Sequence, residues 1–143
     1  MNIPETRTAE TIHVGDNLPS FDKTFRAADL VAYGGATWDW HRLHYDRDYA
    51  QNCSVARPVI DGQMYGAVFA KAISGWLGPR IFIQKLDIKY CSLAYAGDTL
   101  TVEGQVVELE IVDDYGLISV AHILKREGDT VSKARSVVRV PCE

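Results

Sequence analysis

The chain has 143 residues, of which 47% are hydrophobic and 24% are charged, and its formal net charge at pH 7 is −4. This composition indicates about one globular domain with enough apolar side chains for a core, and it excludes disordered, collagen-like and disulfide-scaffold chains. The acidic balance and the lack of an apolar run of about 18 residues argue against nucleic acid and membrane as partners.

We expect the chain to form one domain over residues 1–143, with a loose polar lead-in over residues 1–20. The first six residues lack the apolar core of a signal peptide, so we expect a cytoplasmic protein. A short strand is predicted next, over residues 21–26. A helix is predicted over residues 27–35, with Gly34-Gly35 as its end.

The clearest element is a central helix predicted over residues 62–77. Its apolar side chains repeat in two adjacent rows at a spacing of four residues, and a third row consists of small residues. Only Gln63 and Lys71 are strongly polar, so this helix is expected to be buried. Asp61 is a suitable N-cap, and Gly78-Pro79 is a suitable end.

After this helix the hydrophobic period changes from 3.6 to 2 residues, which is typical of strands with one buried face. Four such runs are separated by turn sequences that contain Gly and Asp, and they cover residues 82–90, 99–106, 117–125 and 130–140. A buried helix followed by four antiparallel strands predicts an α+β domain in which the sheet wraps around the helix. This is the layout of the hot-dog fold.

The three cysteines, Cys53, Cys91 and Cys142, lie far apart and form no C-x-x-C pair, so we expect reduced and partly buried thiols. A nucleophilic Cys53 near the histidines is the sharper alternative. The four histidines lack the H-E-x-x-H spacing and the Cys/His spacing of metal sites, which predicts that the chain has no metal site. His122, in a strand with apolar neighbours, is expected to be a core or interface histidine.

Reactive side chains are densest in residues 37–46, Thr-Trp-Asp-Trp-His-Arg-Leu-His-Tyr-Asp. Asp39 and His44 are five residues apart, which separates them by roughly 140° on a helix and places them on opposite faces of a strand. They can meet only if the segment between them turns. The spacing therefore permits a catalytic carboxylate–imidazole pair, and a solvated polar loop remains the alternative. Asp46 is expected to be the N-cap of a short helix.

The pattern Asp39-x-x-x-x-His44-x-Asp46 resembles the hydratase motif of MaoC-like proteins, the (R)-specific enoyl-CoA hydratases. The resemblance runs from about residue 24 to residue 106. It includes Asp61-Gly62 at the start of the central helix and Gly97-Asp98-Thr99-Leu100 at a strand start. These features also occur in the family's order, with the motif first, the central helix second and the strands last.

The chain departs from the usual motif, Gly-Asp-x-Asn-Pro-x-His-x-Asp, at three positions. Trp38 stands in place of Gly, His41 in place of Asn, and Arg42 in place of Pro. The run from His41 to Asp46 is similar to that of a second branch, the mitochondrial-type hydroxyacyl-thioester dehydratases and mesaconyl-CoA hydratase-like proteins. This mixture leaves the acyl group of the substrate open.

The resemblance implies a hydratase or dehydratase that interconverts 2-enoyl-CoA and 3-hydroxyacyl-CoA without a cofactor, since coenzyme A is part of the substrate. Asp39 would be the general base for water, with His44 holding the same water and sharing the proton transfer. The backbone N–H of Gly62 would face the developing enolate oxygen. Further candidate substrate-binding residues are His41, Trp40 and Asp61. For Asp61-Gly62, a plain helix start is the alternative.

The resemblance also implies a homodimer whose two sheets join, or a heterodimer with another hot-dog chain. Two other functions stay open. A hot-dog acyl-CoA thioesterase is one, although many such enzymes carry Asp or Glu on the central helix and residues 62–77 contain neither. A non-catalytic subunit that binds acyl-CoA is the other.

Overall fold

Most helices lie in the first half of the chain and most strands in the second, in a computed structural model that describes residues 5–142. The helical segments are η1 (Ala9–Thr11), α1 (Ala27–Thr37), η2 (Arg42–His44), α2 (Arg47–Asn52) and α3 (Gln63–Leu77). The strands are β1 (Asn17–Thr24), β2 (Phe82–Tyr90), β3 (Thr99–Val112), β4 (Tyr115–Arg126) and β5 (Asp129–Pro141). This succession follows the predicted one.

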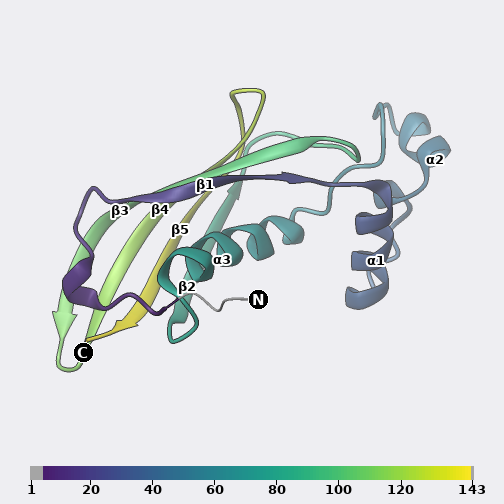
Figure 1. The fold of residues 1–143 in the computed structure, drawn as a ribbon. Helices are drawn as coiled ribbons and strands as arrows, with labels where there is room; N and C mark the ends of the chain where they lie inside the picture. The colour runs from purple at the N-terminus through teal and green to yellow at the C-terminus, as the bar shows by residue number, and fades with distance from the viewer. Residues whose placement is uncertain (1–4, 143) are drawn as a thin grey trace.

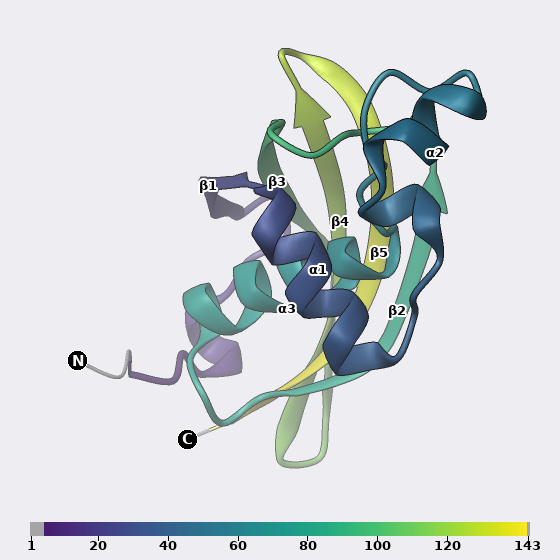
Figure 2. The same ribbon diagram turned by 90° about the vertical axis from the view of Figure 1, so that its right-hand side faces the viewer.

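The strands form one five-stranded antiparallel sheet in the order β1-β3-β4-β5-β2. Figure 1 shows this sheet curving around α3, while α1 and α2 gather at one end of the sheet. Figure 2 shows α1 in front of α3 from that end, so the start of α3 faces the segment that follows α1. The predicted hot-dog arrangement, a sheet wrapped around a central helix, is confirmed.

α3 supplies one side of the core. Phe69, Ile73 and Leu77 repeat every four residues and are fully buried, together with apolar side chains of the strands such as Leu100 and Val138. The opposite side, which carries the small residues and both strongly polar ones, is more exposed. The helix is therefore buried on one side, and not all round as its composition predicted.

Two predicted boundaries are corrected by the structure. β1 begins at Asn17 instead of residue 21, and Ile12 and Leu18 are buried, so the later part of the expected loose lead-in belongs to the fold. Residues 1–4 of that lead-in lie outside the described residues. α1 continues through Gly34-Gly35 to Thr37, because these glycines keep helical geometry and the chain turns only at Trp38.

Three smaller expectations can be compared with the structure. A shift in register between Ile83 and Lys85 leaves Phe82 63% exposed, although it was predicted on the apolar face of its strand. Cys53 and Cys91 are free and exposed instead of partly buried.

In residues 5–142, no helix combines the length and the apolar character needed to cross a bilayer. The cytoplasmic location stays a prediction.

Candidate active site

The segment after α1 turns sharply and thereby brings Asp39 toward His44. Trp38 has a φ of 62° and a ψ of 23°, the left-handed conformation that commonly ends a helix and that favours glycine. The Asp39 Oδ1 atom then accepts the backbone N–H of His41 at 3.1 Å. This local hydrogen bond folds the chain back, which supplies the turn that the spacing of the two residues requires.

Gly34 and Gly35 give this turn its position. A Cβ atom at Gly34 would lie 2.8 Å from the backbone oxygen of Asp39, so only glycine allows α1 to approach the loop this closely. A Cβ atom at Gly35 would make an ordinary 3.5 Å contact with the ring of Trp40. The two glycines thus allow the loop that carries Asp39 to pack closely against α1. They do not end the helix, as was predicted.

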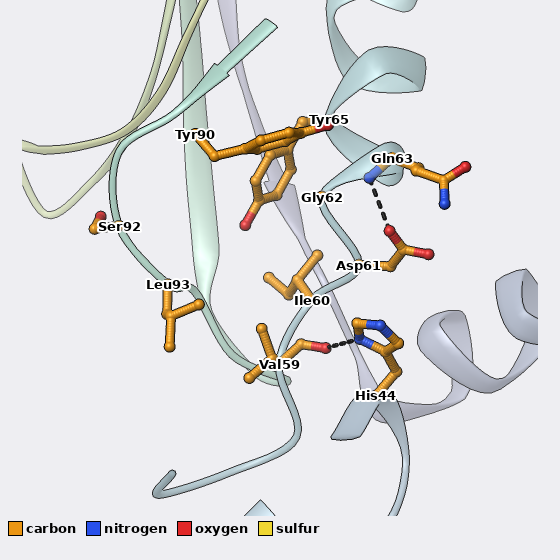
Figure 3. Close-up of a pocket in the computed structure, with 10 residues that line it drawn as sticks. All are labelled: His44, Val59, Ile60, Asp61, Gly62, Gln63, Tyr65, Tyr90, Ser92 and Leu93. Atoms are coloured by element: carbon orange, nitrogen blue, oxygen red, sulfur yellow. Dashed lines mark hydrogen bonds between the residues drawn. The ribbon is translucent and has the colours of Figure 1, made fainter. Parts of the chain in front are cut away.

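His44 is held by the chain segment that leads into α3. Its Nδ1 atom lies 2.8 Å from the backbone oxygen of Val59 (Figure 3). Because a carbonyl oxygen can only accept, Nδ1 carries the hydrogen and donates it. The Nε2 atom is therefore left for another partner. The backbone N–H of Val59 in turn bonds the oxygen of Leu43, so the two segments fix each other.

Asp61 is the third titratable residue at this point, and it is only 7% exposed. Its Oδ1 atom accepts the backbone N–H of Gln63 at 2.8 Å, while Gly62 takes the N-cap position that was predicted for Asp61. Its Oδ2 atom is buried and has no hydrogen-bond partner among residues 5–142. One donor or acceptor atom from each of Asp39, His44 and Asp61 lies within 4.8 Å of the others.

A cavity of about 330 Å³ opens beside these residues at the start of α3 (Figure 3). Its lining is mainly apolar and aromatic, and it consists of His44, Val59, Ile60, Asp61, Gly62, Gln63, Tyr65, Tyr90, Ser92 and Leu93. The backbone N–H of Gly62 has no hydrogen-bond partner in the described part of the chain. A Cβ atom at Gly62 would lie 2.6 Å from the ring of Tyr90, so a larger residue here would displace that ring.

Two tyrosines that the sequence did not single out adjoin the site. Burial and then the charge of Asp98 raise the pKa of Tyr65 to about 12, so its hydroxyl stays protonated. Burial and then the charge of Asp61 raise the pKa of Tyr33, with smaller contributions from Tyr90 and Asp39. Tyr33 lies three residues after the buried Leu30 on α1, and this helical spacing is the one signal that could have found it.

A second group of charges supports one wall of the cavity. Asp98 accepts hydrogen bonds from Arg57 at 2.8 Å, from Arg126 at 3.0 Å and from the backbone N–H of Tyr95 at 2.9 Å. Burial alone would raise the pKa of Asp98, but these hydrogen bonds and the Arg57 charge lower it. The Arg126 guanidinium also donates a hydrogen bond of 3.3 Å to the backbone oxygen of Leu93. Because Leu93 lines the cavity, the network holds this wall in place.

The other predicted site residues lie outside the cluster. His41 is exposed, its Nδ1 atom accepts the N–H of Leu43, and its ring packs edge-on against the ring of His44. Trp40 is 45% exposed and packs against Trp38 and Tyr45, away from the lining of the cavity. The substrate-binding roles of both residues stay predictions.

The two expectations about Asp46 and His122 are confirmed. Asp46 is the N-cap of α2, and its side chain accepts the N–H of Tyr49 at 3.0 Å. His122 is a core residue, 2% exposed, whose Nε2 atom pairs with the hydroxyl of Ser136 at 2.9 Å. Neither residue belongs to the site.

Residues 6–126 match the MaoC-like domain, which is well over half of the chain. The chain belongs to the MaoC-like family. It is 26% identical over 142 residues to the (R)-specific enoyl-CoA hydratase of Aeromonas caviae, covering 94% of this chain and 99% of that one. It is 24% identical over 98 residues to the mitochondrial 3-hydroxyacyl-[acyl-carrier-protein] dehydratase of Arabidopsis thaliana, covering 68% of this chain and 58% of that one. The relatives of this MaoC-like chain are thus hydratases and dehydratases.

Solved structures share the fold of this MaoC-like chain. The (R)-hydratase from A. caviae, described as involved in PHA biosynthesis, superposes with a TM-score of 0.85 at 22% identity, over 92% of this chain and 99% of that one. A chain of the ChsH1–ChsH2 complex from Mycobacterium tuberculosis gives a TM-score of 0.81 at 23% identity, over 91% of this chain and 98% of that one. This agreement supports the hot-dog assignment.

The cluster in this MaoC-like chain also bears on metal binding. Two carboxylates and an imidazole are common metal ligands, and the spacing of up to 4.8 Å between their atoms is one that a divalent cation could bridge. The sequence pattern predicted no metal site because it compared only the spacing along the chain. Whether the protein works without metal stays a prediction.

Proposed function

We propose that this protein catalyses the reversible addition of water to the C2=C3 bond of a 2-enoyl-CoA, giving a 3-hydroxyacyl-CoA, with no resident cofactor. The observation that carries the proposal is the convergence of Asp39 on His44, which lines one cavity together with Gly62 and its unpartnered N–H. The hydratase and dehydratase relatives support the same reaction class.

In this reaction each group has a separate task. Asp39, assisted by Nε2 of His44, takes a proton from water as the water oxygen bonds to C3. The π electrons of the C2=C3 bond move toward C1, and the thioester oxygen gains negative charge. The N–H of Gly62, together with the positive end of the α3 dipole, stabilises that oxygen. Protonation of C2 then completes the 3-hydroxyacyl product.

The cavity suits an acyl thioester. Its volume of about 330 Å³ lies at the lower end of the usual range for small-molecule sites, and its walls are mainly apolar. Val59, Ile60 and Leu93 would contact the uncharged thioester and acyl carbons, while the polar groups converge at one end, at His44 and Asp61 (Figure 3). An acyl group that carries a carboxylate would instead require a cationic lining residue, and none of the lining residues is Lys or Arg.

We also propose that the protein works as a homodimer, with a heterodimer of two hot-dog chains as the alternative. β2 is an edge strand, and its ends expose Phe82 and Tyr90. Tyr90 lines the cavity as well, so a second chain along this edge would cover one side of the site. The structural similarity to a chain of the ChsH1–ChsH2 complex is compatible with either partner. Light scattering of the purified protein measures the mass of the assembly.

The direct test follows the absorbance of the conjugated enoyl thioester with a short and a long 2-enoyl-CoA. We expect the wild-type protein to remove the signal without releasing free coenzyme A. Asp39→Asn and His44→Ala should each slow turnover by about 10²–10⁴-fold while the protein remains folded. Release of free coenzyme A would instead indicate a thioesterase, and tight acyl-CoA binding without turnover would indicate a non-catalytic subunit.

A further inference from the structure

Asp61 has a feature that its position two residues before α3 does not explain. One carboxylate oxygen already accepts the Gln63 N–H and so completes the helix start. The other oxygen is buried and lacks a donor anywhere in residues 5–142. Because burying a charged oxygen without a partner costs free energy, this atom requires a proton, a cation or a reacting group beside it.

Asp61 also belongs to a cluster that contains more acceptors than donors. The Nδ1 atom of His44 donates its hydrogen to the backbone oxygen of Val59, and the Oδ1 atom of Asp39 accepts the His41 N–H. The cluster atoms of Asp39, His44 and Asp61 lie within 4.8 Å of one another. Carboxylates and imidazoles are the groups that exchange protons in general acid–base catalysis, so a proton is the partner that this cluster itself can provide.

We propose that Asp61 is a catalytic residue that holds this proton and delivers it to C2 of the substrate. The inference rests on the proposed hydratase function and completes it, because that function assigns the proton taken from water to Asp39 and His44 and leaves the donor of the proton to C2 open among Asp39, His44 and Asp61. It predicts that the two carboxylates have opposite tasks, with Asp39 accepting a proton while Asp61 donates one.

The positions along the chain favour this division. Asp61 directly precedes Gly62, whose N–H stabilises the thioester oxygen in the proposed function, and C2 is bonded to the carbonyl carbon that carries that oxygen. A donor beside Gly62 therefore lies beside C2. Asp39 comes from a different segment, the loop after α1, and in the proposed function it serves the water that attacks C3.

The proton count balances over one turnover. The water oxygen bonds to C3 and releases one proton to Asp39, and the π pair moves to form the enolate held at Gly62. The enolate carbon C2 then takes the proton of the Asp61 carboxyl group, and the thioester carbonyl re-forms. Asp39 ends with the proton and Asp61 without it. One proton passing back within the cluster, with His44 as a possible relay, restores the starting state, and no oxidant or reductant is needed.

The decisive variant is Asp61→Asn, because the amide oxygen can still accept the Gln63 N–H while the amide cannot donate a carboxyl proton. We expect kcat to fall by about 100-fold or more with KM changed by less than about 3-fold and with an unaltered melting temperature. Asp48→Asn, which removes the same charge from an exposed position on α2, is the matched control and should retain wild-type kcat.

A second readout separates proton delivery from a merely structural role. In D₂O the wild-type enzyme should exchange the C2 hydrogen of 3-hydroxyacyl-CoA through the reverse reaction, and Asp61→Asn should slow that exchange as much as it slows turnover. A variant with kcat within about 5-fold of wild type would overturn the proposal and leave Asp61 as a helix-start residue.

Two further outcomes are informative. Wild-type activity that disappears with a chelator and returns with Mg²⁺ or Mn²⁺ would overturn the proposal and assign the oxygen of Asp61 to a cation. If wild-type protein turns over and Asp39→Asn does not, while Asp61→Asn is fully active, only this inference fails. If wild-type protein leaves every enoyl-CoA unchanged, the proposed function and this inference fail together.

Discussion

Asp61 and Asp98 are buried to nearly the same extent, 7% and 9% exposed, yet their surroundings differ completely. Both oxygens of Asp98 are occupied, by Arg57 on one side and by Arg126 and a backbone N–H on the other. One oxygen of Asp61 is occupied and the other has no donor in the described residues. A fully partnered buried carboxylate indicates a structural role, whereas an incompletely partnered one that faces a cavity indicates chemistry.

The difference predicts opposite consequences for stability. Asp98→Ala removes three hydrogen bonds and leaves the partly exposed Arg57 and Arg126 without their shared counter-ion, so we expect a loss of about 1.5–3 kcal/mol in the free energy of unfolding. Asp61→Ala removes one hydrogen bond at a helix start, and we expect a loss of about 1 kcal/mol. Urea denaturation of both variants measures the comparison.

The two alanine variants control for each other, because each removes a buried carboxylate of the same size. Their activities should rank in the opposite order. Asp98→Ala loosens one wall of the cavity but removes no group from the cluster, so at temperatures where it remains folded it should lose less turnover than Asp61→Ala, which should be nearly inactive. Equal losses of stability in the two variants would contradict the contrast between a partnered and an unpartnered carboxylate.

His122 extends the comparison to a third buried titratable group. Like Asp61, it has one buried atom without a partner, Nδ1, but its ring lies against Phe69 in the core and not at the cavity. Burial lowers the pKa of His122 to about 4 from an ordinary value of 6.5, so it remains neutral in the folded protein. The His122 ring therefore carries no charge in the core, whereas at the site Asp61 is proposed to hold a proton.

This lowered pKa makes stability depend on pH. Between pH 6.5 and about 4 the unfolded chain binds a proton at His122 and the folded protein does not. The free energy of unfolding should therefore fall as pH decreases through this range, by up to about 3 kcal/mol from this residue. Chemical denaturation at several pH values measures the slope.

His122→Gln keeps a side chain that can pair with Ser136 but cannot titrate, and it serves as the control. Its absolute stability is not the readout, since the substitution also changes packing. We expect its stability to vary less with pH than that of the wild-type protein between pH 4 and 6.5. Parallel curves for the two proteins would show that His122 is not the residue responsible.

Much of the fold could be predicted from hydrophobic period alone, because each strand has one buried face and α3 has a clear apolar side. The alternation over 130–140 places Ala134, Ser136, Val138 and Val140 inward, as the structure does. Phe82 and Tyr90 at the ends of β2 are exceptions. A bulge moves Phe82 to the other face of the strand, and a strict period of 2 contains no signal for a bulge.

Less of the site could be predicted from the sequence, because the site depends on contacts between segments that are distant along the chain. Asp39 and His44 could be paired through the motif, but the approach of Asp61 depends on how the start of α3 packs against the loop after α1. Its carboxylate serves the helix start with one oxygen and the cavity with the other, and a sequence pattern shows only the first task. Tyr33 likewise reaches the site through the placement of α1.

Gly34 provides the smallest and most local test, because it concerns the backbone that positions Asp39 and not a carboxylate itself. In a helix interior, Gly→Ala usually stabilises a protein by about 0.5–1 kcal/mol. At Gly34 the new Cβ would stand 2.8 Å from the backbone oxygen of Asp39, so the loop must shift. We therefore expect Gly34→Ala to destabilise by about 1–3 kcal/mol and to lower turnover as Asp39 moves.

Gly35→Ala is the matched control, since its Cβ would make only a 3.5 Å contact with Trp40 and its helical setting is the same. It should be neutral or slightly stabilising and retain wild-type turnover, as thermal unfolding and the enoyl-CoA assay would show together. If both variants behave alike, the position of Asp39 does not depend on a glycine at residue 34. A loss of stability and turnover confined to Gly34→Ala would show that a backbone contact with α1 positions the loop that carries Asp39. Neither the Asp98 network nor the Asp61 carboxylate provides that contact.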